Sequence, residues 1–302
     1  MINATVIAAF GRQSLIRSDQ GEQMSAVARG RSLQVAVGDH VQAVRLGAGQ
    51  AVIEGVSPRS NEFKRSDIAR TKWLASNLDQ AAVVIEPSPP YSEDLLLRVM
   101  IAGRAEGIEL ALIVNKRDLA DASARIEPRL AVYRALGYQL IECSAKHPEA
   151  ARDALMPWLL GRTTLLLGQS GMGKSTLINC LVPDAGQRTR EISQALASGK
   201  HTTSFTRMFA LGDDDSGRII DSPGFQAFGL EHLSSSQRTH AMPEYAPLLG
   251  ACRFHNCTHR TEPGCAIRAA CEDGRIDSLR YQLFARLTDE SESIARSRPR
   301  KG

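Results

Sequence analysis

Short segments in which apolar and polar residues alternate fill roughly the first 65 residues, and Gly, Ser and Asp separate them. This alternation is typical of half-buried β-strands bounded by turns. Five such strands on a small segment predict a small β-barrel of the OB type, although the pattern fits an SH3-like barrel nearly as well. The expected strands are residues 4–10, 14–17, 23–28, 40–44 and 51–56.

From about residue 80 the pattern changes to nearly continuous apolar runs that alternate with helical stretches. Strands are expected at residues 81–85, 110–114, 138–143, 163–167 and 218–220, and helices at 94–105, 128–136 and 175–181. Continuous apolar runs are typical of parallel strands buried on both faces, so this part predicts an α/β fold. The later segments 234–249 and 274–298 have helical composition and predict a small helical unit.

These patterns divide the chain into three expected domains, over residues 1–72, 73–232 and 233–302. A length of 302 residues allows this, because single cores seldom grow beyond roughly 250 residues. The composition, with 43% hydrophobic and 23% charged residues, is ordinary for a soluble protein. No apolar run approaches the roughly 20 residues that span a bilayer, and the N-terminus lacks a secretory signal. We therefore expect a cytoplasmic protein without a membrane partner.

The net charge of +4 is concentrated at the start of the chain, where residues 1–75 hold ten Lys/Arg against six Asp/Glu. Two basic clusters are Arg59, Lys64, Arg65, Arg70 and Lys72, and Arg296, Arg298, Arg300 and Lys301. Both suit a polyanion such as RNA, although a disordered tail accounts for the second cluster equally well. Base-stacking aromatic residues are sparse before Trp73, so any RNA contact would be mainly electrostatic.

A phosphate-binding loop is predicted between an expected strand and an expected helix. The segment from Gly168 to Ser175 fits the pattern G-x-x-x-x-G-K-[ST], whose backbone N–H groups surround phosphates. Lys174 is expected to contact the β- and γ-phosphates, and the Ser175 hydroxyl to bind Mg²⁺. The predicted phosphate-binding residues are Gly168, Gln169, Ser170, Gly171, Met172, Gly173, Lys174, Ser175 and Thr176.

A D-x-x-G element, Asp221 to Gly224, follows a short strand about fifty residues later. Its aspartate is expected to hold Mg²⁺ through water, and the Gly224 amide to contact the γ-phosphate. In the polar stretch between the two elements a threonine should also bind Mg²⁺, and Thr203 is slightly favoured over Thr202.

The residue after Gly224 is Phe225, where many GTPases place a glutamine that orients the attacking water. Phenylalanine cannot polarise water, so we expect slow hydrolysis by the isolated protein. His201 is the nearest residue with suitable chemistry and is the candidate catalytic group, although it is equally well a surface histidine in a mobile loop.

Guanine is expected to bind at the N-K-x-D segment Asn115, Lys116, Arg117 and Asp118. The Asp118 carboxylate can accept hydrogen bonds from the N1–H and the exocyclic amine of guanine, a donor pair that adenine lacks. Lys116 would lie across the base while Asn115 braces the loop. After the next strand, Ser144, Ala145 and Lys146 would bring a backbone amide to the guanine O6.

The guanine-binding segment precedes the phosphate loop by about fifty residues, whereas in ordinary GTPases it follows. This inverted order predicts a circularly permuted GTPase. It also makes the D-x-x-G element the last part of that fold, so the next segment runs directly into the C-terminal unit. We hypothesise that γ-phosphate contact at Gly224 changes the orientation of that unit.

Cys252, Cys257, His259 and Cys265 have the spacing of a structural Cys₃His zinc site, which leaves no open position for catalysis. His255 or Cys271 could replace one of these four ligands. The other two thiols, Cys143 and Cys180, fall in the α/β core and are expected to be small buried residues.

The order of these motifs over essentially the whole chain resembles the RsgA (YjeQ) family of circularly permuted GTPases. The resemblance implies an N-terminal OB domain, a permuted GTPase domain and a zinc domain. It implies GTP with Mg²⁺ and one structural Zn²⁺, and His201 matches the histidine proposed as catalytic in the family.

The resemblance also implies a role in late maturation of the 30S ribosomal subunit. The expected partners are this particle and its 16S rRNA, which would stimulate GTP hydrolysis and thereby release the protein, a monomer. Two alternatives are a GTP-sensing adaptor whose slow hydrolysis is incidental, and a GTPase that acts on tRNA or mRNA.

Overall fold

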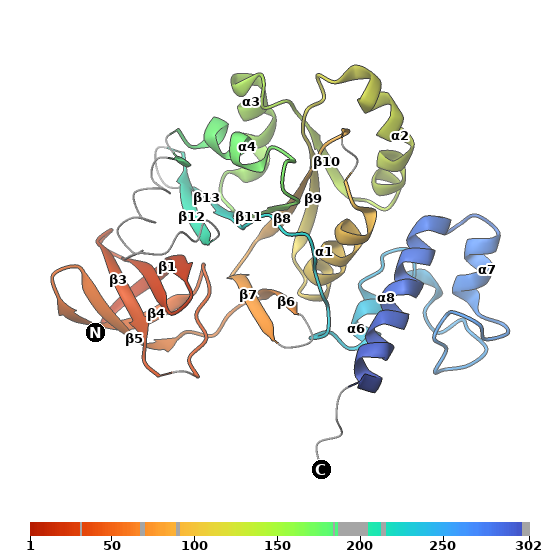
Figure 1. The fold of residues 1–302 in the computed structure, drawn as a ribbon, viewed down its shortest axis with the longest axis horizontal. Coiled ribbons are helices and arrows are strands. Elements are labelled where there is room, and N and C mark those ends of the chain that lie inside the picture. Colours follow the sequence, from red (N-terminus) through yellow and green to blue (C-terminus); the bar gives the residue numbers. More distant parts are fainter. Residues whose placement is uncertain are drawn as a thin grey trace, which may run out of the picture.

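The computed structural model describes residues 1–30, 32–66, 70–88, 91–183, 185–186, 205–212 and 216–297. A β-barrel lies at one end, an α/β domain in the middle and a helical unit at the other end (Figure 1). Within these ranges every helix is too short or too polar to cross a membrane.

The barrel consists of β1 (Ile2–Phe10), β2 (Gln13–Ser18), β3 (Gln23–Ala28), β4 (His40–Gly47) and β5 (Gln50–Val56). The strands follow the order β1-β2-β3-β5-β4, and β1 closes the barrel by pairing with β4. Alternate side chains such as Val6, Ile16 and Ile53 fill its interior, as the period of two predicted. This closed five-stranded barrel confirms the OB-type fold.

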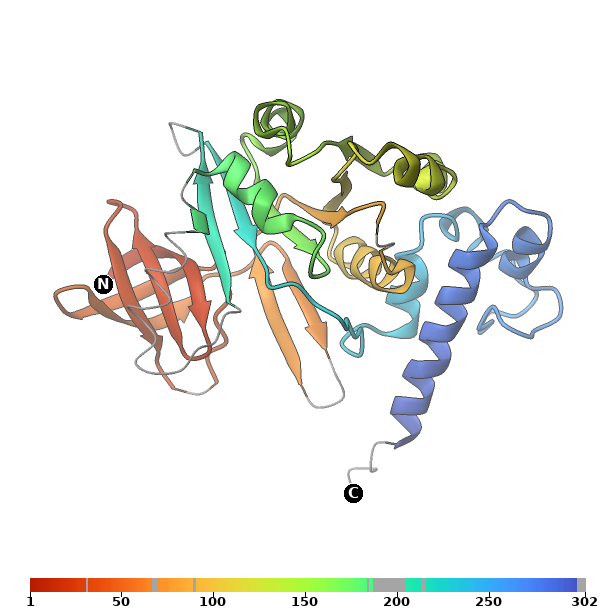
Figure 2. The same cartoon turned by 45° about the horizontal axis from the view of Figure 1, so that its top comes forward.

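Two further strands, β6 (Glu62–Ser66) and β7 (Thr71–Ser76), form a separate hairpin beside the barrel (Figure 2). Phe63 and Leu74 pack in the core of the α/β domain and not in the barrel. The predicted boundary after residue 72 therefore falls within β7. This hairpin was not predicted from the sequence, because Glu62, Lys64 and Arg65 make β6 largely charged.

The α/β domain is a sheet in the order β10-β9-β8-β11-β13-β12, parallel except for β12. Its strands are β8 (Gln80–Ile85), β9 (Glu109–Val114), β10 (Gln139–Glu142), β11 (Thr163–Gly168), β12 (Thr206–Leu211) and β13 (Gly217–Asp221). Its helices are α1 (Glu93–Ala105), α2 (Ala120–Ala135), α3 (Pro148–Leu159) and α4 (Lys174–Leu181). The carboxyl ends of β8, β9 and β11 meet at one edge, where ligands bind in open α/β sheets.

Some elements of this domain differ from the sequence prediction. Helix α2 begins at Ala120 and continues through Pro128, where the helix was expected to start because proline is common in the first turn. Burial of Ile126 and Leu130 on either side of the proline maintains the helix. Helix α3 and strand β12 were not predicted.

The barrel and the α/β sheet are joined edge to edge. Strand β1 pairs with β12 through Ala8 opposite Arg207 and Ala9 opposite Thr206, which makes one continuous sheet. The ring of Phe10 lies 4.1 Å from that of Phe205, measured between centroids. The barrel is therefore attached to the strand that follows the predicted Mg²⁺-binding threonines.

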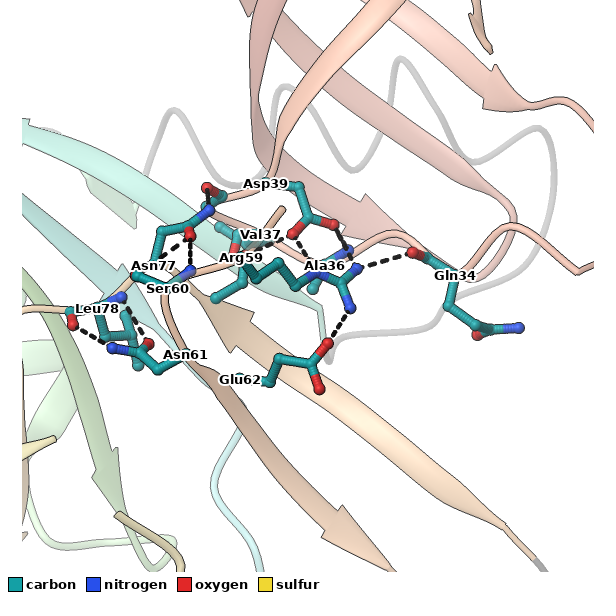
Figure 3. Close-up of polar contacts among 12 residues, drawn as sticks. Gln34, Ala36, Val37, Asp39, Arg59, Ser60, Asn61, Glu62, Asn77 and Leu78 are labelled. Atoms are coloured by element: carbon teal, nitrogen blue, oxygen red, sulfur yellow. Dashed lines mark hydrogen bonds and ion pairs between the residues drawn. The ribbon is translucent and has the colours of Figure 1, made fainter. Parts of the chain in front are cut away.

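A buried ion pair forms a second joint, between the barrel and the β6–β7 hairpin (Figure 3). Asp39, which is fully buried in the barrel, accepts two hydrogen bonds of 2.7 Å from Arg59 and one of 2.6 Å from the Ser76 hydroxyl at the end of β7. Arg59 also donates to Glu62 at 2.6 Å. Arg59 therefore does not contribute to the predicted basic cluster, because Asp39 and Glu62 neutralise its charge within the protein.

The C-terminal unit contains α6 (Ser235–His240), the 3₁₀ turn η1 (Ala246–Leu248), α7 (Ala266–Glu272) and α8 (Ser278–Ser297). The helix expected over 234–249 is thus only a short helix and a turn, because Pro243 and Pro247 interrupt it. Helices α6 and α8 pack against α1, and Phe284 and Leu287 of α8 belong to the same apolar core as the α/β domain.

Candidate functional site

The phosphate loop lies between β11 and α4, as its motif predicts. Gly171 and Gly173 have φ values of 90° and 81°, which residues other than glycine rarely adopt. A Cβ on Gly173 would also lie only 2.2 Å from the side-chain nitrogen of Asn115. Glycine at 173 therefore allows the guanine-binding loop to approach the phosphate loop closely.

Lys174 and Asp221 are brought together at the phosphate end of the site. Lys174 is 8% exposed and forms an ion pair with Asp221, and its Nζ also donates to the Ser222 carbonyl at 2.5 Å. Ser175 and Thr176 are exposed at the start of α4. An ammonium, a hydroxyl and a carboxylate at one helix N-terminus are the groups that a phosphate–Mg²⁺ complex requires.

Gly224 lies directly against the phosphate loop. A Cβ built on it would be 3.2 Å from the backbone nitrogen of Ser170. Phe225, the next residue, is 5% exposed, and its ring lies 5.4 Å from that of Phe228. The side chain that follows Gly224 is therefore packed in the core.

Asn115 connects the three predicted nucleotide-binding loops. Its buried side chain donates to the Met172 carbonyl of the phosphate loop and accepts from the Ala145 N–H, both at 3.0 Å. Arg117 is turned away and forms ion pairs with Glu127 and Glu142.

The carboxylate of Asp118 is held ready to accept hydrogen bonds. The Ser144 hydroxyl donates to it at 2.5 Å, and Lys146 Nζ lies 3.9 Å from it. The hydrogen bond from Ser144, and then the charge of Lys146, hold the pKa of Asp118 below its usual range. An ionised, exposed carboxylate at this place fits the paired N–H donors of guanine.

Lys116 adopts a left-handed backbone conformation with φ of 59°. Its Nζ lies 2.5 Å from Glu86 Oε2 and 3.4 Å from the Gly171 carbonyl oxygen. Glu86 follows β8 and is 1% exposed. It is a member of the site that the motifs did not reveal.

The candidate catalytic residue His201 and the two candidate Mg²⁺ ligands Thr202 and Thr203 lie outside the described residues. Their assignments stay predictions.

The four predicted zinc ligands lie together. One ligand atom from each of Cys252, Cys257, His259 and Cys265 lies within 4.8 Å of the others, although the fourteen-residue loop that carries them contains little regular structure. His255 and Cys271 are not part of this group. Three thiolates and one imidazole are a preferred ligand set of tetrahedral Zn²⁺, so these residues fit that ion.

Glu262 organises the loop between the second and the last of these ligands. Its carboxylate accepts from the Thr258 N–H and hydroxyl, at 2.7 and 2.6 Å, and from the Arg260 N–H at 3.1 Å. Burial alone would raise the pKa of Glu262, but the hydrogen bonds from Thr258 hold it well below its usual range. In the sequence, only the position of Glu262 between the metal ligands Cys257 and Cys265 indicated that it organises this loop.

Comparison with known proteins identifies the family. The model of the RsgA GTPase family matches residues 56–231. The protein named Small ribosomal subunit biogenesis GTPase RsgA from Paraburkholderia phytofirmans (strain DSM 17436 / LMG 22146 / PsJN) is 49% identical over 300 residues, covering 98% of this chain and 95% of its own. The protein of that name from Burkholderia pseudomallei (strain K96243) is 50% identical over 293 residues, covering 96% and 93%.

The chain belongs to the RsgA GTPase family. It is therefore a GTP hydrolase, as the motifs predicted, and membership of the RsgA family implies Mg²⁺ bound with GTP. Among solved structures, YjeQ from Thermotoga maritima superposes with a TM-score of 0.73 at 23% identity, covering 98% of this chain and 99% of its own. The structure titled YloQ, a circularly permuted GTPase, gives 0.68 at 23% identity, covering 99% and 97%. Both confirm the permuted fold.

Proposed function

We propose that this RsgA-family GTPase acts in late maturation of the 30S ribosomal subunit. It binds the particle and its 16S rRNA as a cytoplasmic monomer and hydrolyses GTP slowly when alone. The particle stimulates hydrolysis, and hydrolysis releases the protein. The names of relatives about half identical over nearly the whole chain support the partner.

The buried side chain of Phe225 is the observation that carries this proposal. It occupies the position from which many GTPases orient the attacking water, and a packed phenyl ring cannot do so. Hydrolysis then needs another group, for which His201 remains our candidate, and a partner that positions it.

RNA binding is proposed for the barrel and the adjoining hairpin. Arg59 and Lys64 of the predicted basic cluster form ion pairs within the protein. The proposed basic surface includes Arg65 and Lys72 of the hairpin strands, with Arg296 near the end of α8.

Single-turnover GTP hydrolysis, measured with 30S subunits, with 50S subunits, with free 16S rRNA and without a partner, tests the proposal. Strong acceleration by 30S subunits alone is expected. Equal rates with and without 30S subunits would instead indicate a GTP-sensing adaptor, and equal acceleration by free RNA would indicate a GTPase that acts on RNA.

The zinc site is proposed with one Zn²⁺ bound by Cys252, Cys257, His259 and Cys265. Metal analysis of the purified protein should find stoichiometric zinc, and Cys257→Ser should lose it because a hydroxyl is a poor replacement for a thiolate ligand. The matched variant Cys271→Ser should retain it. A wild-type protein without zinc would contradict the assignment.

A further inference from the structure

Glu86 lies at the centre of the nucleotide-binding edge of the sheet. It directly follows β8, which pairs with β9 through Ile85 opposite Val114 and with β11 through Val84 opposite Gly168. Its neighbours at this edge are thus Asn115, where the guanine-binding loop begins, and the start of the phosphate loop. The fold places one carboxylate between the segments that bind the two ends of the nucleotide.

The charge of Glu86 has one described ionic partner. The side chain is 1% exposed, and Lys116 Nζ lies 2.5 Å from Oε2. Within the described ranges no group donates a hydrogen bond to this oxygen, so the ion pair with Lys116 is its only described polar contact. A buried carboxylate without a counter-charge is strongly unfavourable, so Lys116 is held where its ammonium neutralises Glu86.

This contact defines the path of the Lys116 side chain. The backbone begins in the guanine-binding loop with φ of 59°, and the ammonium ends 3.4 Å from the Gly171 carbonyl oxygen of the phosphate loop. The four-carbon stem therefore bridges the two loops. The Lys116 side chain is only 36% exposed and its ammonium is ion-paired, so it has lost most of its rotamer freedom before a nucleotide binds.

We infer that Glu86 is a positioning residue of the nucleotide site, which acts through Lys116 to preorganise the surface against which the guanine base packs. This inference rests on the proposed guanine site. The described contact of Glu86 is with Lys116 of the guanine-binding loop, so its contribution is to the binding of GDP and GTP alike. The rate of the chemical step at the γ-phosphate does not depend on it.

The test is a double-mutant cycle of Glu86→Gln and Lys116→Met, with dissociation constants measured for fluorescent GDP and for a fluorescent non-hydrolysable GTP analogue. Glu86→Gln keeps the shape of the side chain and removes its charge. It should weaken the binding of both nucleotides by about the same factor, roughly tenfold, because lost preorganisation reduces affinity. In the Lys116→Met background, Glu86→Gln should no longer weaken binding.

Steady-state hydrolysis stimulated by 30S subunits gives a second readout. Glu86→Gln should raise KM for GTP and leave kcat at saturating GTP unchanged. Glu109→Gln, at the opposite end of β9, is the matched control and should leave both parameters unchanged. Glu86→Asp keeps the charge on a shorter side chain, should bind nucleotides with intermediate affinity, and serves if Glu86→Gln does not fold.

An affinity of Glu86→Gln within twofold of wild type would overturn the inference, as would an equal loss of affinity in the Lys116→Met background or a fall in kcat alone. If Glu86→Asp is the variant that folds, wild-type affinity in it has the same meaning. A wild-type protein that bound GDP no better than ADP would defeat the proposed guanine site itself.

Discussion

Asn115 and Asp118 make different contacts in the predicted guanine-binding loop. The buried amide of Asn115 connects the loop to the phosphate loop and to Ala145, whereas the exposed carboxylate of Asp118 is oriented by Ser144. Asn115 therefore connects the loops of the site, and we propose that Asp118 presents the atoms that distinguish one base from another.

Base specificity should change with Asp118→Asn. An asparagine amide presents one acceptor and one N–H donor, which fits xanthine, where a carbonyl replaces the exocyclic amine of guanine. We expect GTP affinity to fall at least about a hundredfold and XTP affinity to rise, because the paired hydrogen bonds are lost for one base and gained for the other. Competition binding with GDP and XDP measures this, and an unchanged preference for GDP would remove Asp118 from base recognition.

His201→Ala should lower 30S-stimulated hydrolysis and leave GTP affinity intact. A general base or water-orienting histidine contributes roughly 10²- to 10⁴-fold to the rate, and it acts on the water and not on the nucleotide. Single-turnover rates and dissociation constants of the same preparation separate the two effects. Turnover equal to that of the wild type would exclude His201 from the mechanism.

Among the elements, those with a simple periodic pattern were predicted from the sequence. The barrel strands and β8, β9 and β11 lie within three residues of their expected ends, because period-two alternation or continuous apolar runs mark them. The β6–β7 hairpin was missed because Lys64 and Arg65 interrupt its apolar pattern. Whether an Arg or a Glu is buried depends on partners distant in sequence, which explains why Arg59 and Glu86 were not recognised.

The joint between barrel and hairpin depends on Arg59. Arg59→Met removes the counter-charge of Asp39, whose side chain is fully buried, and should destabilise the protein by about 3 kcal/mol. Asp39→Asn combined with Arg59→Met should recover part of this loss, because no buried charge then stays unpaired. Urea unfolding of the wild type and of these two variants measures the change in stability. Equal stability of Arg59→Met and wild type would show that the pair contributes nothing to the joint.

At the scale of the whole molecule, circular permutation determines which segments leave the GTPase fold. The chain after Gly224 runs directly to α6, and on the way the Gly229 carbonyl accepts a hydrogen bond of 3.0 Å from the Ser66 N–H of the hairpin. At the other edge β12 is paired with β1 of the barrel. The C-terminal unit is thus attached to the segment that follows Gly224, and the barrel to the strand that follows the predicted Mg²⁺-binding threonines.

These attachments give physical content to the hypothesis that γ-phosphate contact at Gly224 changes the orientation of the C-terminal unit. A change at Gly224 or in the segment before β12 would alter the orientation of the units proposed to contact the 30S subunit. The motif order predicted the attachment of the C-terminal unit. The edge-to-edge joint of β1 and β12 could not be predicted, because strand pairing between domains leaves no periodic pattern in either sequence.

The most direct measurement is the amount of protein that sediments with 30S subunits in the presence of a non-hydrolysable GTP analogue and of GDP. We expect the protein to sediment with the particle when the analogue is bound and to remain in the supernatant with GDP. With 50S subunits as the control, neither nucleotide should bring it down. Equal retention on 30S subunits with both nucleotides would contradict the proposed release of the protein by GTP hydrolysis.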